Sequence, residues 1–92
     1  MSFEKILVSE TFAVKEADEI RQKTEELLEK GNREFIFDFS QCNFMDSTGL
    51  GVLVSLHKRC SEMNGRVKIE SVYNRDVLKI FELTRLDKVF GL

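Results

Sequence analysis

The sequence predicts an α/β fold, in which a mixed, mostly parallel sheet carries helices packed mainly on one face. Three short apolar segments typical of strands alternate with three amphipathic segments typical of helices, and such alternation is characteristic of α/β domains. Of the 92 residues, 42% are hydrophobic and 33% are charged, a balance that argues against disorder and fits one small domain over residues 1–92. Right-handed crossovers are expected to place the first two helices on the same face of the sheet.

The strand segments are Phe3–Val8, Glu34–Phe39 and Arg66–Val72. The first is short and apolar. In the second, three phenylalanines alternate, but Ile36 between them is apolar as well. This pattern is typical of a central strand that is buried on both faces. In the third, apolar and polar residues alternate, so we expect one buried face.

Three further segments have apolar residues at helical spacing, namely Glu16–Lys30, Thr48–Asn64 and Arg75–Leu83. The inner stripe of the second helix is expected to consist of Val52, Leu53, Leu56, Cys60 and Met63. Gly31 and Gly65 follow the first two helices, where C-terminal caps are wanted, and Asn74 is a suitable N-cap for the third. Residues 9–15 and 40–46 are expected to be connections, and residues 86–90 a short strand or a last helical turn.

Charge and hydropathy exclude several classes of protein. Fourteen Lys and Arg against 16 Asp and Glu give a net charge of -2, so the basic excess of a nucleic-acid binder is missing. No apolar run approaches the roughly 20 residues that span a bilayer, and the start of the chain lacks the pattern of a signal peptide. We therefore expect a cytoplasmic protein that does not insert into membranes, with Cys42 and Cys60 as reduced thiols.

The most informative segment is Asp46–Gly51, which reads Asp-Ser-Thr-Gly-Leu-Gly and opens the second helix. A helix start exposes unpaired N–H groups, and Asp46 or Ser47 can accept hydrogen bonds from them as the N-cap. Gly49 and Gly51 are poor helix formers, but they leave room for another backbone or a partner. Two interpretations stay open. The segment is a simple cap, or it presents a hydroxyl whose phosphorylation changes binding without unfolding the domain.

Ser47, Leu50 and Val54 recur at i, i+3 and i+7, on a side of the helix distinct from the inner stripe. If the inner stripe forms the core, Leu50 and Val54 are partly exposed beside Ser47 and form an apolar docking patch. The alternative is a wide-faced helix that buries both rows.

Phe44–Val52 closely resembles the phosphorylation-site motif of the STAS-domain anti-sigma factor antagonists. The resemblance continues through Gly65–Ile69, Val77–Thr84 and Leu86–Phe90. It implies a STAS-like domain that binds an anti-sigma factor with serine/threonine kinase activity and thereby controls transcription. It also implies that phosphorylation at Ser47 ends this binding, and that a phosphatase acting on the phosphorylated form restores it.

The resemblance also suggests roles for the residues around Ser47. Asp46, Thr48 and Gly49 would form the switch loop. The partner-binding residues would be Leu50, Val54, Met45 and Glu10.

The chain departs from the family pattern in three places. The family usually has two strands before the first helix, whereas the segment before Glu16 has room for about one. The N-terminal strand region is therefore expected to be shortened, with an open sheet edge that a second copy could pair with in a homodimer. Phe12 stands where the family carries Asp, and Arg85 where Gly commonly follows Leu-Thr. The short N-terminal region and Phe12 favour an alternative role as a constitutive accessory subunit of a lipid-transport ABC complex, without phosphorylation.

Enzymatic motifs are weak. His57 lies ten residues after Ser47 on the same predicted helix, which separates them by about 15 Å at 1.5 Å rise per residue, too far for His57 to act as a base for the serine. Cys42, Cys60 and His57 lack the paired spacing of zinc ligands. Gly49–Gly51 is too short for a dinucleotide fingerprint, although weak nucleotide binding at the helix start stays open. We therefore expect no catalytic residue, metal or cofactor.

Overall fold

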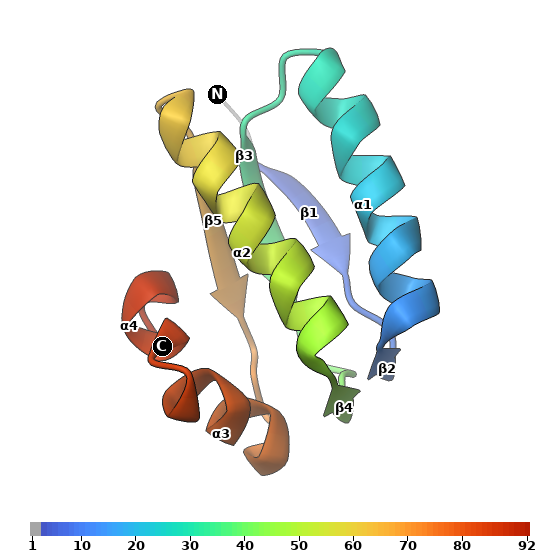
Figure 1. Cartoon of the computed structure of the whole chain (residues 1–92), viewed down its shortest axis with the longest axis vertical. Helices are drawn as coiled ribbons and strands as arrows, with labels where there is room; N and C mark the ends of the chain where they lie inside the picture. Colours follow the sequence, from blue (N-terminus) through green and yellow to red (C-terminus); the bar gives the residue numbers. More distant parts are fainter. Residues whose placement is uncertain (1–2) are drawn as a thin grey trace.

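The computed structural model describes residues 3–92, and Met1 and Ser2 of the expected 1–92 domain lie outside the described residues. A small parallel sheet carries two long helices on one face, and two shorter helices lie at one end (Figure 1). The elements in chain order are β1 Glu4–Leu7, β2 Thr11–Phe12, α1 Val14–Glu29, β3 Glu34–Asp38, β4 Phe44–Met45, α2 Ser47–Glu62, β5 Arg66–Glu70, α3 Arg75–Leu83 and α4 Leu86–Phe90.

The main sheet has the strand order β1-β3-β5. Ile6, Phe37 and Ile69 lie in register across it. The long helices α1 and α2 connect these strands and cover the same face (Figure 1), as right-handed crossovers require. The predicted α/β class and the one-sided helix packing are confirmed. Within residues 3–92 every strand pair is parallel, so the described sheet has no antiparallel member.

The core lies between the sheet and the two long helices. It is dominated by phenylalanines, four of which form edge-to-face contacts with ring centroids 5.7–6.1 Å apart. These are Phe12, Phe39, Phe81 and Phe90. The predicted inner stripe of α2 is confirmed except at Met63, whose side chain is 37% exposed. The reason is that α2 ends at Glu62 and Met63 is its C-cap, so the chain has already turned away from the core.

Both cysteines lie in this core, with Cys42 2% and Cys60 0% exposed. Burial raises the pKa of each thiol above its ordinary value, which disfavours the reactive thiolate. We expect Ellman's reagent to label neither cysteine in the native protein at neutral pH, and to label both in denaturant. Labelling of the native protein at the rate of a free thiol would contradict the packing described here.

Within residues 3–92, no helix covers the far face of the main sheet. Lys5, Ile36 and Lys68 lie in register there, and the Lys5 Nζ pairs with Glu70 Oε1 at 3.1 Å, which raises the pKa of Lys5. Ile36 is half-buried. The expectation that the central strand is buried on both faces is therefore wrong. On this face Ile36 lies between two lysines, and a helix packed there would have to bury their charges.

Two strands were not expected. The segments 9–15 and 40–46, predicted as connections, contain β2 and β4, which form a separate parallel pair with Phe12 opposite Met45. Each strand has only two residues, which is too short for an alternating pattern to stand out. The N-terminal strand region is thus short, as predicted, but it supplies two strands before α1 rather than one.

The turn after α2 is built differently from the prediction. Asn64, and not Gly65, adopts the left-handed conformation, with φ 61°. Gly65 is required for another reason. A Cβ atom at this position would lie 1.9 Å from the carbonyl oxygen of Arg33, which accepts a hydrogen bond from the Arg66 N–H at 3.0 Å. Gly65 therefore lets the entry into β5 pass directly against the entry into β3.

The chain ends in helical structure. Asn74 caps α3, since its Oδ1 accepts hydrogen bonds from the N–H groups of Asp76 and Val77. The tail forms α4, so its interpretation as a helical turn is confirmed. Between the two helices, Arg85 adopts φ 65° and ψ 11°. The turn therefore has the left-handed geometry that the family's glycine favours, although an arginine occupies it.

Replacing Arg85 with glycine is expected to raise the melting temperature. A residue other than glycine in the left-handed region destabilises the fold by roughly 1–2 kcal/mol, and glycine removes this strain. Glycine also makes the unfolded chain more flexible, which offsets about 0.4–1 kcal/mol of the gain. The remainder corresponds to a rise of a few degrees, at about 4–8 °C per kcal/mol. Thermal unfolding followed by circular dichroism measures it. Arg85→Ala keeps the strain and is the control; an equal rise in both variants would contradict the explanation.

Candidate functional site

The segment that opens α2 is fixed by the side chain of Asp46. Its Oδ1 accepts hydrogen bonds from the N–H groups of Thr48 at 2.9 Å and Gly49 at 3.1 Å. Asp46 is therefore the N-cap of α2, and Ser47 is not. Because the carboxylate satisfies two of the free N–H groups at the helix start, the local fold does not require the hydroxyl of Ser47.

Ser47 is the first residue of α2, and its side chain is exposed. Within residues 3–92 its hydroxyl makes no hydrogen bond under the usual distance and angle limits. It stands at the amino end of a helix, where the backbone carries a partial positive charge. The arrangement presents an accessible hydroxyl at a position where an added negative charge is compatible with the helix.

Gly49 provides the close packing beneath this loop. A Cβ atom there would lie 2.5 Å from the carbonyl oxygen of Phe12, and the same oxygen accepts a hydrogen bond from the Asp46 N–H at 3.3 Å. Its expected role in admitting another backbone is therefore confirmed, and that backbone belongs to β2. At Gly51 a Cβ atom would meet nothing within 4 Å, so this glycine leaves an open surface.

Phe12 itself is fully buried beneath the loop. Its ring contacts Phe39 edge-on, with the centroids 6.0 Å apart. Phe12 stands where the resemblance leads us to expect an acidic residue, and its side chain packs in the core instead of placing a charge beside the loop.

Glu10 is bonded through its backbone to the segment that precedes the switch loop. Its carbonyl oxygen accepts hydrogen bonds from the N–H groups of Asn43 at 2.8 Å and Phe44 at 3.2 Å, and its side chain is exposed. The structure therefore brings Glu10 to the same end of the molecule as Ser47.

The apolar residues around Ser47 differ in accessibility. Val54 is 39% exposed, while Leu50 is partly buried against the core. Met45 is 2% exposed, so its side chain packs inward and cannot contact a partner from this position. Its neighbour Phe44, which the sequence reasoning did not select, is 54% exposed. In a strand, adjacent side chains point to opposite faces. Had residues 44–45 been predicted as a strand, this alternation would have indicated that only one of Phe44 and Met45 faces outward.

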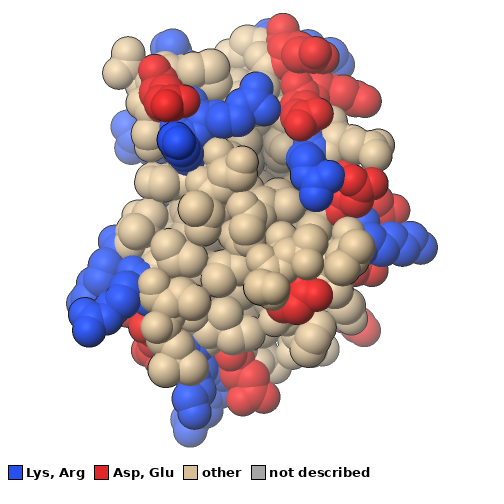
Figure 2. Space-filling view, in the orientation of Figure 1, with Lys and Arg blue, Asp and Glu red and all other residues tan. Residues whose placement is uncertain are grey.

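The exposed face around α2 carries little charge. Figure 2 shows a broad uncharged area in the middle of the molecule, with acidic and basic side chains mostly toward its margins. The first 11 residues of α2, from Ser47 to His57, include no Asp, Glu, Lys or Arg. We call the exposed residues Phe44, Ser47, Gly51 and Val54 the switch face. None of these four residues carries a charge.

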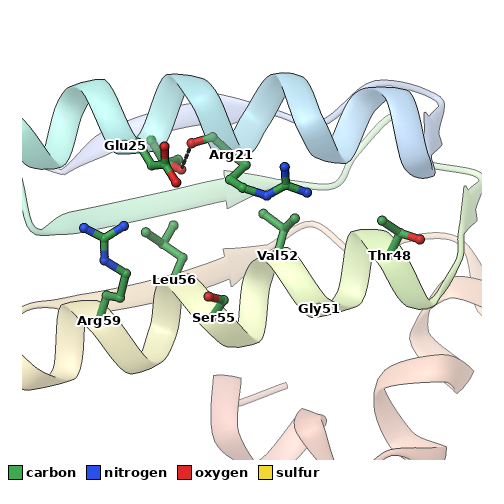
Figure 3. Close-up of a pocket in the computed structure, with 9 residues that line it drawn as sticks. Arg21, Glu25, Thr48, Gly51, Val52, Ser55, Leu56 and Arg59 are labelled. Atoms are coloured by element: carbon green, nitrogen blue, oxygen red, sulfur yellow. Dashed lines mark hydrogen bonds between the residues drawn. The ribbon is translucent and has the colours of Figure 1, made fainter.

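A groove lies between α1 and α2 beside the switch face (Figure 3). It encloses about 240 Å³. Its lining residues are Arg21, Thr24, Glu25, Thr48, Gly51, Val52, Ser55, Leu56 and Arg59. Sequence reasoning missed this groove because it combines residues from two helices, and the contact between α1 and α2 has no signature in a single sequence.

His57 lies on α2 and packs against the last helix. Its ring is half-buried and packs edge-on against Phe90, with the centroids 5.4 Å apart. No group of three or more His, Cys, Asp or Glu side chains within residues 3–92 is placed to hold a metal ion. In the same part of the chain, no helix has the length and apolarity needed to cross a membrane.

Comparison with known proteins identifies relatives of this chain. A family model described as "STAS domain" matches residues 6–92. The anti-sigma-B factor antagonist of Bacillus subtilis (strain 168) is 30% identical over 73 residues, which cover 79% of this chain and 65% of that protein. The chain thus spans a little under two thirds of the length of this curated relative.

Solved structures share the fold. The NMR structure of the protein TM1081 matches with a TM-score of 0.78 and 26% identity, over 91% of this chain and 67% of that one. The Bacillus cell fate determinant SpoIIAA in its phosphorylated form matches with a TM-score of 0.72 and 20% identity, over 91% and 78%. At this identity, the likeness to SpoIIAA concerns the fold. The family match over nearly the whole chain, joined to the fold and to the loop that opens α2, shows that the chain belongs to the STAS domain family.

Proposed function

We propose that this protein is an anti-sigma factor antagonist, a regulatory binding module that phosphorylation of Ser47 switches off. The observation that carries the proposal is the separation of roles at the start of α2. Asp46 caps the helix, while the neighbouring Ser47 is exposed on the switch face. A modification at Ser47 therefore changes the surface and leaves the fold intact.

The charge argument gives the direction of the switch. A phosphate adds roughly -1.5 to -2 charges, and the amino end of α2 accepts negative charge without loss of helix stability. A partner seated on Phe44, Val54 and Gly51 would have to bury that charge in the contact. Burying an unpaired charge is costly, so the phosphorylated form would release the partner.

Two relatives support the proposal by their names. The Bacillus subtilis relative is an anti-sigma-B factor antagonist. SpoIIAA is described as an anti-sigma factor antagonist, and its structure has been solved in phosphorylated and unphosphorylated forms. The two forms match this chain with TM-scores of 0.72 and 0.71, which supports the idea that phosphorylation leaves this fold in place.

The proposed partner is an anti-sigma factor with serine/threonine kinase activity, and a phosphatase would act on the phosphorylated form. We place this cycle in the cytoplasm. The antagonist would be a ligand and a substrate, with no catalysis and no cofactor of its own. The comparisons do not favour the alternative role in a lipid-transport ABC complex, which becomes an outcome of the test.

The test is affinity capture from the source cells with the unmodified protein, followed by incubation of the captured complex with ATP. We expect an anti-sigma factor kinase to be recovered and to place one phosphate on Ser47, located by mass spectrometry. Ser47→Ala should still capture the kinase but remain unphosphorylated. Recovery of an ABC-type ATPase, with no phosphate on the serine, would overturn the proposal in favour of the accessory-subunit role.

A further inference from the structure

The outer edge of β1 is left unpaired by the fold. β1 lies at one side of the main sheet beside β3, and within residues 3–92 no strand pairs with its other side. The N–H of Val8, which follows β1, donates to the carbonyl oxygen of Asp38 at 2.9 Å, so the backbone groups of Val8 point toward β3. Because these groups alternate in direction along a strand, those of Ile6 point toward β3 as well. The N–H and C=O groups of Lys5 and Leu7 therefore point outward.

These outward groups are free to bind another strand. In the part of the chain that the structure describes, neither Lys5 nor Leu7 makes a backbone hydrogen bond outside the sheet. Both side chains are exposed, that of Leu7 to 55%. Unpaired edges of this kind accept an extended segment of another chain, whose main-chain groups supply the missing hydrogen bonds.

α1 extends over the space beside this edge. Figure 1 shows α2 in front of the sheet and α1 along the outer side of β1. On α1, Ala17 and Thr24 face the core, while Arg21 faces α2 across the groove. At about 100° per residue, Ile20 and Leu27 lie on the other side of that buried row. Both are only partly buried, so α1 presents apolar surface above the open edge.

We infer that this edge binds one extended segment of a partner protein, in which apolar residues alternate with acidic ones. The segment would add a strand to the main sheet. Its apolar side chains would pack beneath Ile20 and Leu27, and its acidic side chains would lie on the other face, where opposite charge across from Lys5 is favourable. The Lys5 ammonium pairs with Glu70 and has further N–H donors to offer. The inference does not depend on the proposed function, because it uses neither Ser47 nor the switch face.

A second copy of this chain fits the edge less well than a single strand does. Two antiparallel β1 strands would be related by a two-fold axis perpendicular to the sheet, which keeps both α1 helices on the same face. Each α1 reaches past the edge of its own sheet (Figure 1), so the two helices would overlap. A homodimer through β1 is an outcome that the experiment separates.

The experiment is an NMR titration of the whole protein with a short peptide in which valine and glutamate alternate, with valine at both ends. In the free protein we expect rapid amide exchange at Lys5 and Leu7, and protection at Ile6 and Val8. Saturating peptide should protect Lys5 and Leu7 as well. A free protein that sediments as a dimer, with these two amides already protected, would overturn the inference in favour of a second copy.

Methylated peptides test the strand pairing itself. In an antiparallel pair, the residues opposite Lys5 and Leu7 exchange hydrogen bonds with them, and these residues are the glutamates. N-methylation of the glutamates should therefore weaken binding roughly tenfold or more, while N-methylation of the valines should change it little. A parallel pair would reverse this preference. Equal binding of the two methylated peptides, or shifts that do not saturate with the parent peptide, would overturn the inference.

Variants of the protein test the same edge from the other side. The Leu7 N–H points outward, so Leu7→Pro removes an edge donor without removing a hydrogen bond to β3, and it should abolish peptide binding. Lys5→Gln should remove the preference for glutamate over lysine in the peptide, which we expect to be about twofold to fivefold. Lys68→Gln is the matched control, because Lys68 lies on the same face but in β5. Unchanged binding in Leu7→Pro, or equal loss of the preference in both lysine variants, would contradict the inference.

Discussion

Ser47→Asp is expected to abolish binding of the anti-sigma factor while the domain stays folded. The carboxylate would stand on the uncharged switch face, where a bound partner would bury it. Burying an unpaired charge costs several kcal/mol, which corresponds to a loss of affinity on the order of a hundredfold or more. In the free protein the same carboxylate lies at the amino end of α2, where it is neutral or favourable for stability. Isothermal titration with the captured partner and a thermal melt measure the two effects.

Ser61→Asp is the matched control for this variant. Ser61 is an exposed serine near the opposite end of the same helix, so the change in charge is identical but lies far from the switch face. We expect it to bind as the unmodified protein does. Equal affinity of Ser47→Asp and the unmodified protein would refute the switch, and a large fall in the melting temperature would show that Ser47 has a structural role.

Gly65→Ala is expected to be the most destabilising of the small substitutions in this chain. The new Cβ atom would lie 1.9 Å from the Arg33 carbonyl oxygen and 2.8 Å from its carbon, so the backbone of one segment must move. The movement would stretch the hydrogen bond from Arg66 to that oxygen and disturb the first paired residues of β3 and β5. Overpacking of this kind costs about 1–3 kcal/mol, or a fall in melting temperature of roughly 5–20 °C.

The chain provides a control of opposite sign in Gly51→Ala. Gly51 is exposed within α2, and an added Cβ atom would meet nothing within 4 Å. Alanine in a helix interior is favoured over glycine by about 0.8–1 kcal/mol, so this variant should melt at a higher temperature. Chemical unfolding of the two variants beside the unmodified protein tests the pair. Similar stability in all three would contradict the close approach at Gly65.

Strong periodic patterns made most of the fold predictable. The alternating phenylalanines of β3 and the long apolar stripe of α2 each extend over several residues, so they identified a central strand and a core-facing helix. The error at Ile36 has a physical origin, because an apolar residue in the middle of a strand does not say whether a second layer covers it. Phe12 and Met45 were missed as strand residues because two-residue strands form through their tertiary contacts rather than through a local pattern.

The candidate site was predictable only where it is contiguous in the sequence. The switch loop, including the N-cap Asp46, lies within the six residues from Asp46 to Gly51. The start of a helix has a recognisable composition. The groove could not be found in this way, since it forms only when α1 packs against α2. The exchange of Met45 for the exposed Phe44 follows from the pleat of β4, which the sequence reasoning treated as a loop.

Asp46 caps α2 while Ser47 is exposed beside it, and this has a consequence for how a cell could use the protein. Because the cap belongs to the aspartate, the two chemical states of the serine should be equally folded and should resist proteolysis to the same extent. Their lifetimes would then match. The fraction of the protein that is phosphorylated at Ser47, rather than the total amount of protein, would then carry the signal. Such a signal could be reversed without new protein synthesis.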